Sequence, residues 1–178
     1  LLEPDAAEKL VRKVTDFLKN WIDLQRETFP TIDGIFLLDD IIGFMGGPEF
    51  LHFGFPYFKE LFDQDVSVKF LHNDAPCKVS APHLADMGVN LFNMGIDVTL
   101  PELQQLTQNK ITLMGNLPPR DVLAKASADE VKQATIDMID ALENKSRILL
   151  SCGGGMPPGV KSENIQAFLD AVNEVSGK

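Results

Sequence analysis

The chain has few of the residue types that mark several large classes of protein. It contains only two cysteines, Cys77 and Cys152, which are far apart in the sequence. A disulfide framework is therefore not expected, and we predict reduced thiols in a cytoplasmic protein. Basic residues are outnumbered, with 16 Lys and Arg against 26 Asp and Glu, and the formal net charge is -10. Nucleic acids and anionic membranes both need basic patches, so neither is expected as the main partner.

Long apolar runs and nucleotide-binding motifs are also missing. No segment approaches the roughly 18 consecutive apolar residues of a membrane-spanning helix. Neither GxGxxG nor GxxxxGK(S/T) follows the first predicted strand, which disfavours the nucleotide-binding folds. The opening residues 1–5, LLEPD, resemble neither a signal peptide nor a native start with methionine. We therefore expect a piece of a longer protein, whose 44% hydrophobic residues are enough for a globular core.

Apolar periodicity predicts one helix followed by five β-α units. Apolar residues at three- and four-residue spacing predict an amphipathic helix from Pro4 to about Glu27. Five short apolar runs then alternate with predicted helices. The predicted strands are 35–38, 66–71, 89–92, 111–114 and 147–150, and the helices are 50–62, 82–87, 101–107, 127–142 and 164–175. This alternation is typical of an α/β protein with a parallel sheet and right-handed crossovers.

Each predicted strand ends at a polar group. These groups are Asp39-Asp40, His72–Asp74, Asn93, Asn116 and Cys152. Polar groups at the carboxyl ends of the strands are typical of a (β/α)8 barrel active site, but a complete barrel needs about 250 residues. The sequence therefore predicts a partial TIM (β/α)8-type barrel, with residues 1–178 as a single domain. The exposed inner face of such a piece predicts pairing, either with a second copy as a homo-oligomer or with missing N-terminal units.

The segment His72–Cys77 combines an imidazole, a carboxylate and a thiol within one turn. Such a combination can bind a metal ion or move protons. Alternatively, His72 is a strand-end histidine that bonds to backbone, and Asn73-Asp74 forms an Asx-type turn. The residues alone leave both interpretations open.

The other strand ends also allow two interpretations each. The adjacent carboxylates Asp39 and Asp40 bind substrate or act as acid and base, or else they cap a helix or loop. Asn116 orients substrate or backbone at the barrel mouth, or it is a turn residue. The loop Gly153–Gly155 permits close backbone approach, which suits the binding of a phosphate or carboxylate.

Four motifs together resemble the uroporphyrinogen decarboxylase superfamily. They are the strand end ITLMGNLPP (residues 111–119), the loop GGGMPP (153–158), the helix start Glu163–Ile165 and the segment Phe55–Tyr57. The superfamily also holds the methylcobalamin:coenzyme M methyltransferases and other corrinoid-dependent methyltransferases. The resemblance runs from about Asp33 onward and implies the C-terminal part of such a barrel.

The methyltransferase branch implies a zinc site. In that branch a His-x-Cys pair and a later Cys hold zinc, and the acceptor thiolate attacks a corrinoid-bound methyl group. His72 matches the first ligand, Asp74 stands where the branch has Cys, and Cys152 lies close to the third position. We therefore expect a zinc-dependent methyltransferase with His72, Asp74 and Cys152 as metal ligands, and Cys77 as a possible substitute. The resemblance further implies a corrinoid as methyl carrier, and a corrinoid protein or small molecule as partner.

The remaining site residues follow from the same reasoning. We expect catalytic roles for Asp39, Asp40 and Asn116, and cofactor binding by Gly153, Gly154 and Gly155. The decarboxylase branch needs no metal and uses arginines and an aspartate from the N-terminal third of the barrel, which this sequence lacks. The histidine that this branch carries in its last Gly-rich loop would fall near Gly154, so this sequence lacks it. Decarboxylation of uroporphyrinogen in tetrapyrrole biosynthesis is therefore the alternative, and a non-catalytic half-barrel is a further one.

Overall fold

A computed structural model describes residues 2–177, so Leu1 and Lys178 of the predicted domain lie outside the described part. Helices and strands alternate along the chain. The elements are α1 (Pro4–Thr28), β1 (Gly34–Leu38), α2 (Gly47–Glu49), α3 (Phe55–Phe62), β2 (Val68–Asn73), β3 (Leu91–Met94), α4 (Leu100–Leu106), β4 (Thr112–Leu117), α5 (Ala128–Asp140), β5 (Ile148–Cys152) and α6 (Ser162–Ser176). Within residues 2–177, five parallel strands form one sheet in the order β1-β2-β3-β4-β5. The predicted α/β class is confirmed.

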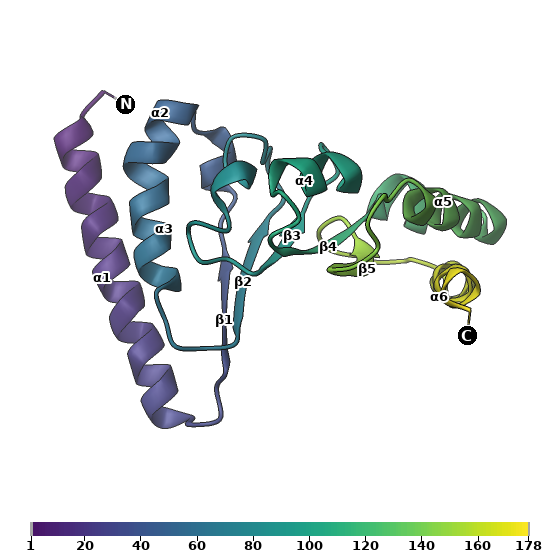
Figure 1. The fold of residues 1–178 in the computed structure, drawn as a ribbon, viewed down its shortest axis with the longest axis horizontal. Coiled ribbons are helices and arrows are strands. Elements are labelled where there is room, and N and C mark those ends of the chain that lie inside the picture. Colours follow the sequence, from purple (N-terminus) through teal and green to yellow (C-terminus); the bar gives the residue numbers. More distant parts are fainter. Residues whose placement is uncertain (1, 178) are drawn as a thin grey trace.

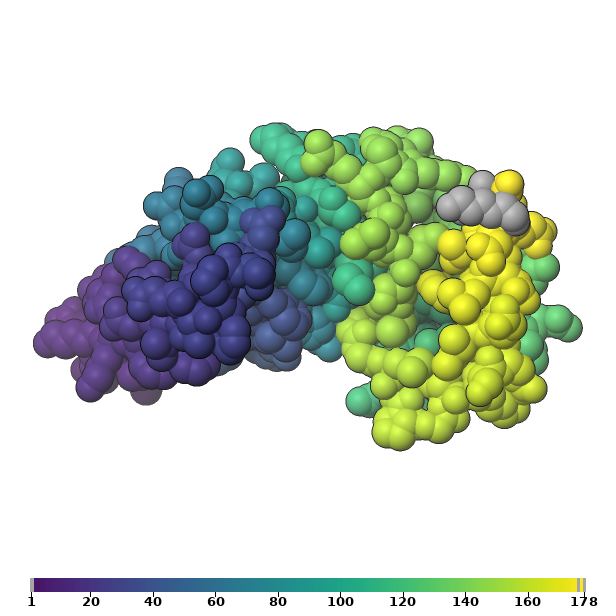
Figure 2. All heavy atoms as spheres, turned by 90° about the horizontal axis from the view of Figure 1, so that it is seen from below, coloured from purple at the N-terminus to yellow at the C-terminus, as the bar shows by residue number. Residues whose placement is uncertain are grey.

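Two pairs of helices lie at the two ends of the sheet. Figure 1 shows α1 beside α3 at the N-terminal end, and α5 beside α6 at the C-terminal end. In the space-filling view of Figure 2, the N-terminal and C-terminal parts lie at opposite ends of the molecule. Because each crossover returns to the neighbouring position, the strands follow one another as they do around a barrel. None of the described helices is both long enough and apolar enough to cross a membrane.

Ion pairs join α1 to α3. The carboxylate of Glu60 on α3 lies 2.6 Å from Nη2 of Arg12 and 2.6 Å from Nζ of Lys19. These hydrogen bonds lower the pKa of Glu60 to about 2. Ile22, on the next turns of α1, is buried against the sheet. The amphipathic helix predicted from the sequence is thus held by two ion pairs to α3 and by the burial of its apolar side.

Apolar side chains fill the side of the sheet that the helices cover. Alternate strand residues face this side, and Leu71, Phe92 and Leu113 lie side by side there, each at most 1% exposed. Burial of each such side chain contributes about 1.5–3 kcal/mol. A smaller cluster lies under α5 and α6 and comprises Leu117, Leu123, Val131 and Ala167. We call this the C-terminal cluster.

The opposite face of the sheet is open. A row of paired residues crosses it in the order Leu38, His72, Asn93, Met114 and Leu149. Leu38 is 65% exposed and Leu149 is 48% exposed. Exposed apolar side chains here agree with the exposed inner face predicted for a partial barrel. The copy or segment that covers this face stays a prediction.

Several elements differ clearly from the sequence prediction, and one of them is the third strand, which was predicted at 89–92 and runs from Leu91 to Met94. The second strand, predicted at 66–71, runs from Val68 to Asn73, because its pairing with β1 begins at Gly34 opposite Val68. His72 therefore belongs to the strand and does not follow it. The helix predicted at 82–87 is only a short 3-10 turn at Ala81–His83. So short a segment gains too few hydrogen bonds to offset the cost of nucleating an α-helix.

Candidate active site at the carboxyl ends of the strands

His72 lies on the open face of β2 and is held on two sides. Its side chain is 18% exposed, and its ring meets the ring of Phe36 edge-on at a centroid distance of 6.5 Å. Nδ1 lies 2.7 Å from Oδ1 of Asn93 on the neighbouring strand. Nε2 lies 3.5 Å from Oδ2 of Asp74. The two strands therefore present the Nε2 edge of the ring to a carboxylate.

Asp74 is positioned by the chain around it. Its backbone N–H donates to Oδ1 of Asp40 at 2.7 Å. Oδ1 of Asn73 accepts from the N–H of Ala75 at 2.7 Å, which forms the Asx-type turn named above as an alternative. The carboxylate lies against Gly154, where a Cβ atom would overlap both carboxylate oxygens. The turn and the functional interpretation are thus compatible, because the turn places Asp74 beside His72.

Cys152 is not brought together with this pair. It is paired with Leu117, packs against the C-terminal cluster and so faces the helices, whereas His72 lies on the open face. Its Sγ donates to the carbonyl oxygen of Gly154 at 3.3 Å. Burial raises the pKa of the Cys152 thiol, and the nearby charge of Asp74 raises it further. Among residues 2–177, no three His, Cys, Asp or Glu side chains form a group that could hold a metal ion.

Cys77 is excluded as a substitute ligand. Its side chain is fully buried within the apolar core under the helices. Burial, as the main cause, raises the pKa of this thiol to about 12. Because zinc binds thiolate rather than thiol, Cys77 is a core residue here.

His72 and Asp74 alone have the spacing of two zinc ligands. Two donor atoms at about 2.1 Å from a tetrahedral zinc ion lie roughly 3.4 Å apart. The observed separation of Nε2 and Oδ2 is 3.5 Å. Nitrogen and oxygen donors of this kind both suit zinc. The pair therefore fits the ion that the resemblance implies, whereas the set that includes Cys152 does not.

Asp39 and Asp40 contact the backbone around the end of β1. Oδ1 of Asp39 accepts from the N–H of Ile42 at 3.0 Å, at the start of a short helical turn. Burial raises the pKa of Asp39, although hydrogen bonds from the N–H groups of Ile41 and Ile42 oppose the shift. Asp40 binds the N–H of Asp74, as described above. Both carboxylates thus have the capping role named as the alternative, and their catalytic role stays a prediction.

Asn116 is buried at the end of β4. Its Nδ2 donates to the carbonyl oxygens of Gly95 at 3.2 Å and of Val98 at 2.7 Å. The side chain therefore orients the loop that follows β3, which is one of the roles the sequence allowed. A catalytic role in contact with substrate stays a prediction.

The Gly-rich loop after β5 borders a cavity of about 330 Å³. Gly153 and Gly155 line it together with Asp74, and Arg120 contributes a cationic side chain. Gly154 has a φ of +70° and closes against the Asp74 carboxylate. The three glycines therefore shape one wall of the candidate site, while cofactor binding by them stays a prediction.

The sequence of the chain matches a known protein family over almost its whole length. A protein-family model described as Uroporphyrinogen decarboxylase (URO-D) matches residues 1–175. The chain belongs to the uroporphyrinogen decarboxylase family. The resemblance stated from the sequence motifs is therefore confirmed.

Curated relatives of this family match almost the whole chain. Uroporphyrinogen decarboxylase of Chloroherpeton thalassium is 25% identical over 98% of the chain, and that of Christiangramia forsetii is 27% identical over 97%. The human uroporphyrinogen decarboxylase is 25% identical over 97% of the chain. These matches cover 50%, 50% and 48% of the relatives, so the chain spans about half their length.

A solved structure shows the same fold. A methyltransferase from Methanosarcina mazei superposes with a TM-score of 0.72 at 19% identity, over 97% of this chain and 53% of the other. At this identity the likeness concerns the fold alone. Together with the five parallel strands in chain order, it supports the partial barrel predicted for this family member.

Sequence reasoning missed two residues of the candidate site in this family member. Asn93 was noted only as a polar strand end, and its contact with His72 follows from the pairing of β2 with β3. Arg120 was not among the predicted site residues, although it directly follows the strand end GNLPP (residues 115–119) on which the family resemblance rests. Its position just after a strand carboxyl end was the available signal.

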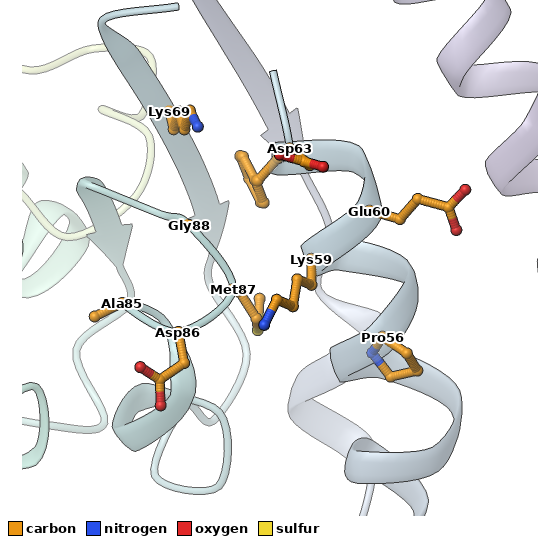
Figure 3. Close-up of a pocket in the computed structure, with 10 residues that line it drawn as sticks. Pro56, Lys59, Glu60, Asp63, Lys69, Ala85, Asp86, Met87 and Gly88 are labelled. Atoms are coloured by element: carbon orange, nitrogen blue, oxygen red, sulfur yellow. The ribbon is translucent and has the colours of Figure 1, made fainter. Parts of the chain in front are cut away.

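A second depression, of about 430 Å³, lies away from this site. Figure 3 shows it between α3 and the turn Ala85–Gly88, with Lys69 above. Lys69 stands near the start of β2, so this depression borders the amino ends of the strands. Glu60 points away from the Ala85–Gly88 turn, and its carboxylate pairs with α1. In barrels of this kind the amino ends serve stability, and catalysis takes place at the carboxyl ends.

Proposed function

We propose that the intact protein is a zinc-assisted methyltransferase in which His72 and Asp74 are two of the metal ligands. The observation that carries the proposal is the 3.5 Å separation of Nε2 of His72 and Oδ2 of Asp74. We assign the remaining ligand positions to the substrate thiol and to groups outside residues 2–177. When bound, zinc would supply a thiolate near neutral pH, which is the nucleophile that methyl transfer needs.

The charges around the pair support a cation. Asp39, Asp40 and Asp74 all lie at the ends of β1 and β2, and Arg120 is the cationic side chain that lines the adjacent cavity. Clustered carboxylates attract a divalent ion and repel a substrate that itself carries many carboxylates. This balance favours metal-assisted methyl transfer over chemistry on a polycarboxylate.

The chain's own residues would hold the donor atoms in place. Asp40 and Gly154 fix the backbone and the carboxylate of Asp74, and Asn93 fixes the ring of His72. Phe36 lies against that ring from β1 and shields it from water on one side. The methyl donor would be a corrinoid, bound to a partner protein or free, presented at the carboxyl ends of the strands.

Decarboxylation of a tetrapyrrole is the second candidate. The curated relatives are named uroporphyrinogen decarboxylase, and the described residues do not complete a three-ligand metal group. In that case Nε2 of His72 would transfer a proton without a metal ion. Arg120 would then contact one substrate carboxylate, and the other carboxylates would need cationic groups outside residues 2–177.

Zinc content of the intact protein separates the two candidates. We expect near one zinc per chain in the untagged wild type, and its loss in His72→Ala and in Asp74→Ala. The Cys152→Ala and Cys77→Ala variants are matched controls that should keep the ion. A folded wild type without zinc, even after zinc addition, contradicts the proposal, and release of CO2 from uroporphyrinogen by that protein supports decarboxylation. Loss of zinc in Cys152→Ala would contradict the two-ligand assignment.

A further inference from the structure

Both ends of the Asn93 side-chain amide are occupied. The side chain is buried, and its Nδ2 donates to the carbonyl oxygen of Met114 on β4 at 2.6 Å. Its Oδ1 faces Nδ1 of His72 at 2.7 Å. The opposite orientation of the amide would set Oδ1 against the Met114 carbonyl, which also can only accept. The contact with Met114 therefore fixes which end of the amide faces His72.

This orientation determines where the imidazole proton lies. Because Oδ1 of Asn93 can only accept, Nδ1 of His72 must carry a hydrogen. We propose that Asn93 is a positioning residue that holds neutral His72 as the Nδ1–H tautomer, with the lone pair of Nε2 directed toward Asp74. That lone pair can bind a cation or accept a proton. The role of Nε2 rests on the proposed function, whereas the tautomer is a property of the chain without metal.

Asp74 by itself would favour the other tautomer. Its carboxylate oxygen faces Nε2 and would accept a hydrogen from it. However, the separation is 3.5 Å, compared with 2.7 Å between Nδ1 and Asn93. Only the shorter distance lies within the usual range of a strong hydrogen bond. In the neutral ring Asn93 therefore outweighs Asp74, and Nε2 is the nitrogen that carries the lone pair, as a cation site requires.

The tautomer can be read from imidazole nitrogen shifts. We would record long-range 1H–15N spectra of the intact, metal-free, 15N-labelled protein at a pH where the rings are neutral. His72 should show a protonated Nδ1 and a pyridine-type Nε2. His52 serves as an internal reference, because its Nε2 lies 2.9 Å from Oε1 of Glu8 and should carry the hydrogen. A protonated Nε2 and bare Nδ1 at His72 in the folded wild type would overturn the proposal.

Two variants at position 93 distinguish the effect of the hydrogen-bond acceptor from the effect of side-chain size. Asn93→Leu keeps the size but removes the acceptor, so His72 should change to the Nε2–H tautomer. Asn93→Asp keeps an acceptor toward His72, although it loses the hydrogen bond to the Met114 carbonyl, and the folded variant should retain Nδ1–H. An unchanged tautomer in Asn93→Leu contradicts the proposal, and if that variant does not fold, the wild-type spectrum decides.

Zinc affinity then links the tautomer to the proposed function. Competition with a chelator should show about 10–100-fold weaker zinc binding in Asn93→Leu than in wild type. A wild type with the expected tautomer but without zinc binding rejects the metal role and leaves the tautomer assignment standing. Zinc binding with equal affinity in wild type and Asn93→Leu rejects the positioning role and leaves the metal site standing.

Discussion

The backbone N–H of Asp74 donates to Oδ1 of Asp40 at 2.7 Å, and this bond joins the segments that follow β1 and β2. A second bond runs in the opposite direction, from the N–H of Asp39 after β1 to the carbonyl oxygen of His72 on β2 at 3.0 Å. Of the two carboxylates after β1, Asp40 therefore contacts the candidate site directly, through the backbone of Asp74 that it holds. We expect the placement of Asp74 beside His72 to depend on this bond.

Removing the Asp40 acceptor should displace Asp74. Asp40→Ala leaves the Asp74 N–H without its partner, so we expect a loss of about 1 kcal/mol in the free energy of unfolding, from denaturant titration. The loss in zinc affinity or activity, expressed as a free energy, should exceed the loss in the free energy of unfolding, because Asp74, a proposed zinc ligand, moves. Asp40→Asn keeps an acceptor at the same place and should behave close to wild type. Equal losses in the two variants would show that the charge, and not the bond, matters.

The glycine loop offers a matched pair of substitutions. Gly154 has a φ of +70°, and a Cβ there would overlap the Asp74 carboxylate, whereas a Cβ at Gly155 meets nothing within 4 Å. Gly154→Ala should lower the free energy of unfolding by about 1–3 kcal/mol through backbone strain and the displaced carboxylate. Gly155→Ala should change it by less than about 0.5 kcal/mol. Urea unfolding of both variants checks the difference, and equal effects would contradict this arrangement of the loop.

The α1–α3 contact should make stability depend on pH in acid. Hydrogen bonds from Arg12 and Lys19 lower the pKa of Glu60 from 4.5 to about 2. A carboxyl with a depressed folded pKa stabilises the fold above its unfolded pKa and loses that effect as the pH falls toward the folded value. Glu60→Gln should therefore remove part of the stability lost between pH 4.5 and pH 2. The effect should be about 1 kcal/mol or less, because the pair is partly exposed.

Thermal melts across that range would measure this effect. Glu27→Gln is the control, since Glu27 is an exposed carboxylate of α1 that forms no ion pair within residues 2–177. The difference between wild type and Glu60→Gln should shrink toward pH 2. A difference that stays constant from pH 6 to pH 2 would argue against the depressed pKa of Glu60.

The two thiols should react at very different rates. Burial raises the pKa of Cys77 to about 12 and leaves no exposed surface, whereas Cys152 is only partly buried. Iodoacetamide at pH 7.5 should therefore modify Cys152 slowly and Cys77 only after unfolding. Mass spectrometry of the native and the denatured protein gives the two rates. Modification of Cys77 in the native protein at the rate of Cys152 would contradict its place in the core.

Much of the fold could be predicted from the sequence, because the patterns that indicate helices and strands are local. The amphipathic spacing up to Ile22 predicted α1, and the helix predicted at 127–142 begins where expected, at Ser127, which forms both hydrogen bonds of a capping box with Glu130. The second strand was placed two residues too early. Its limits depend on pairing with β1, which no local pattern encodes.

The family, the α/β class and the polar residues at the strand ends could be predicted from the sequence, because they depend on residue type and order. Which of those residues meet depends on how the sheet folds. Strand alternation turns Cys152 toward the C-terminal cluster and His72 toward the open face, although both stand at strand ends. Parallel pairing sets Asn93 beside His72, and the turn after β2 brings Asp74 to Nε2. Side-chain direction and strand register are long-range properties, so the partners within the site emerge only when the sheet is assembled.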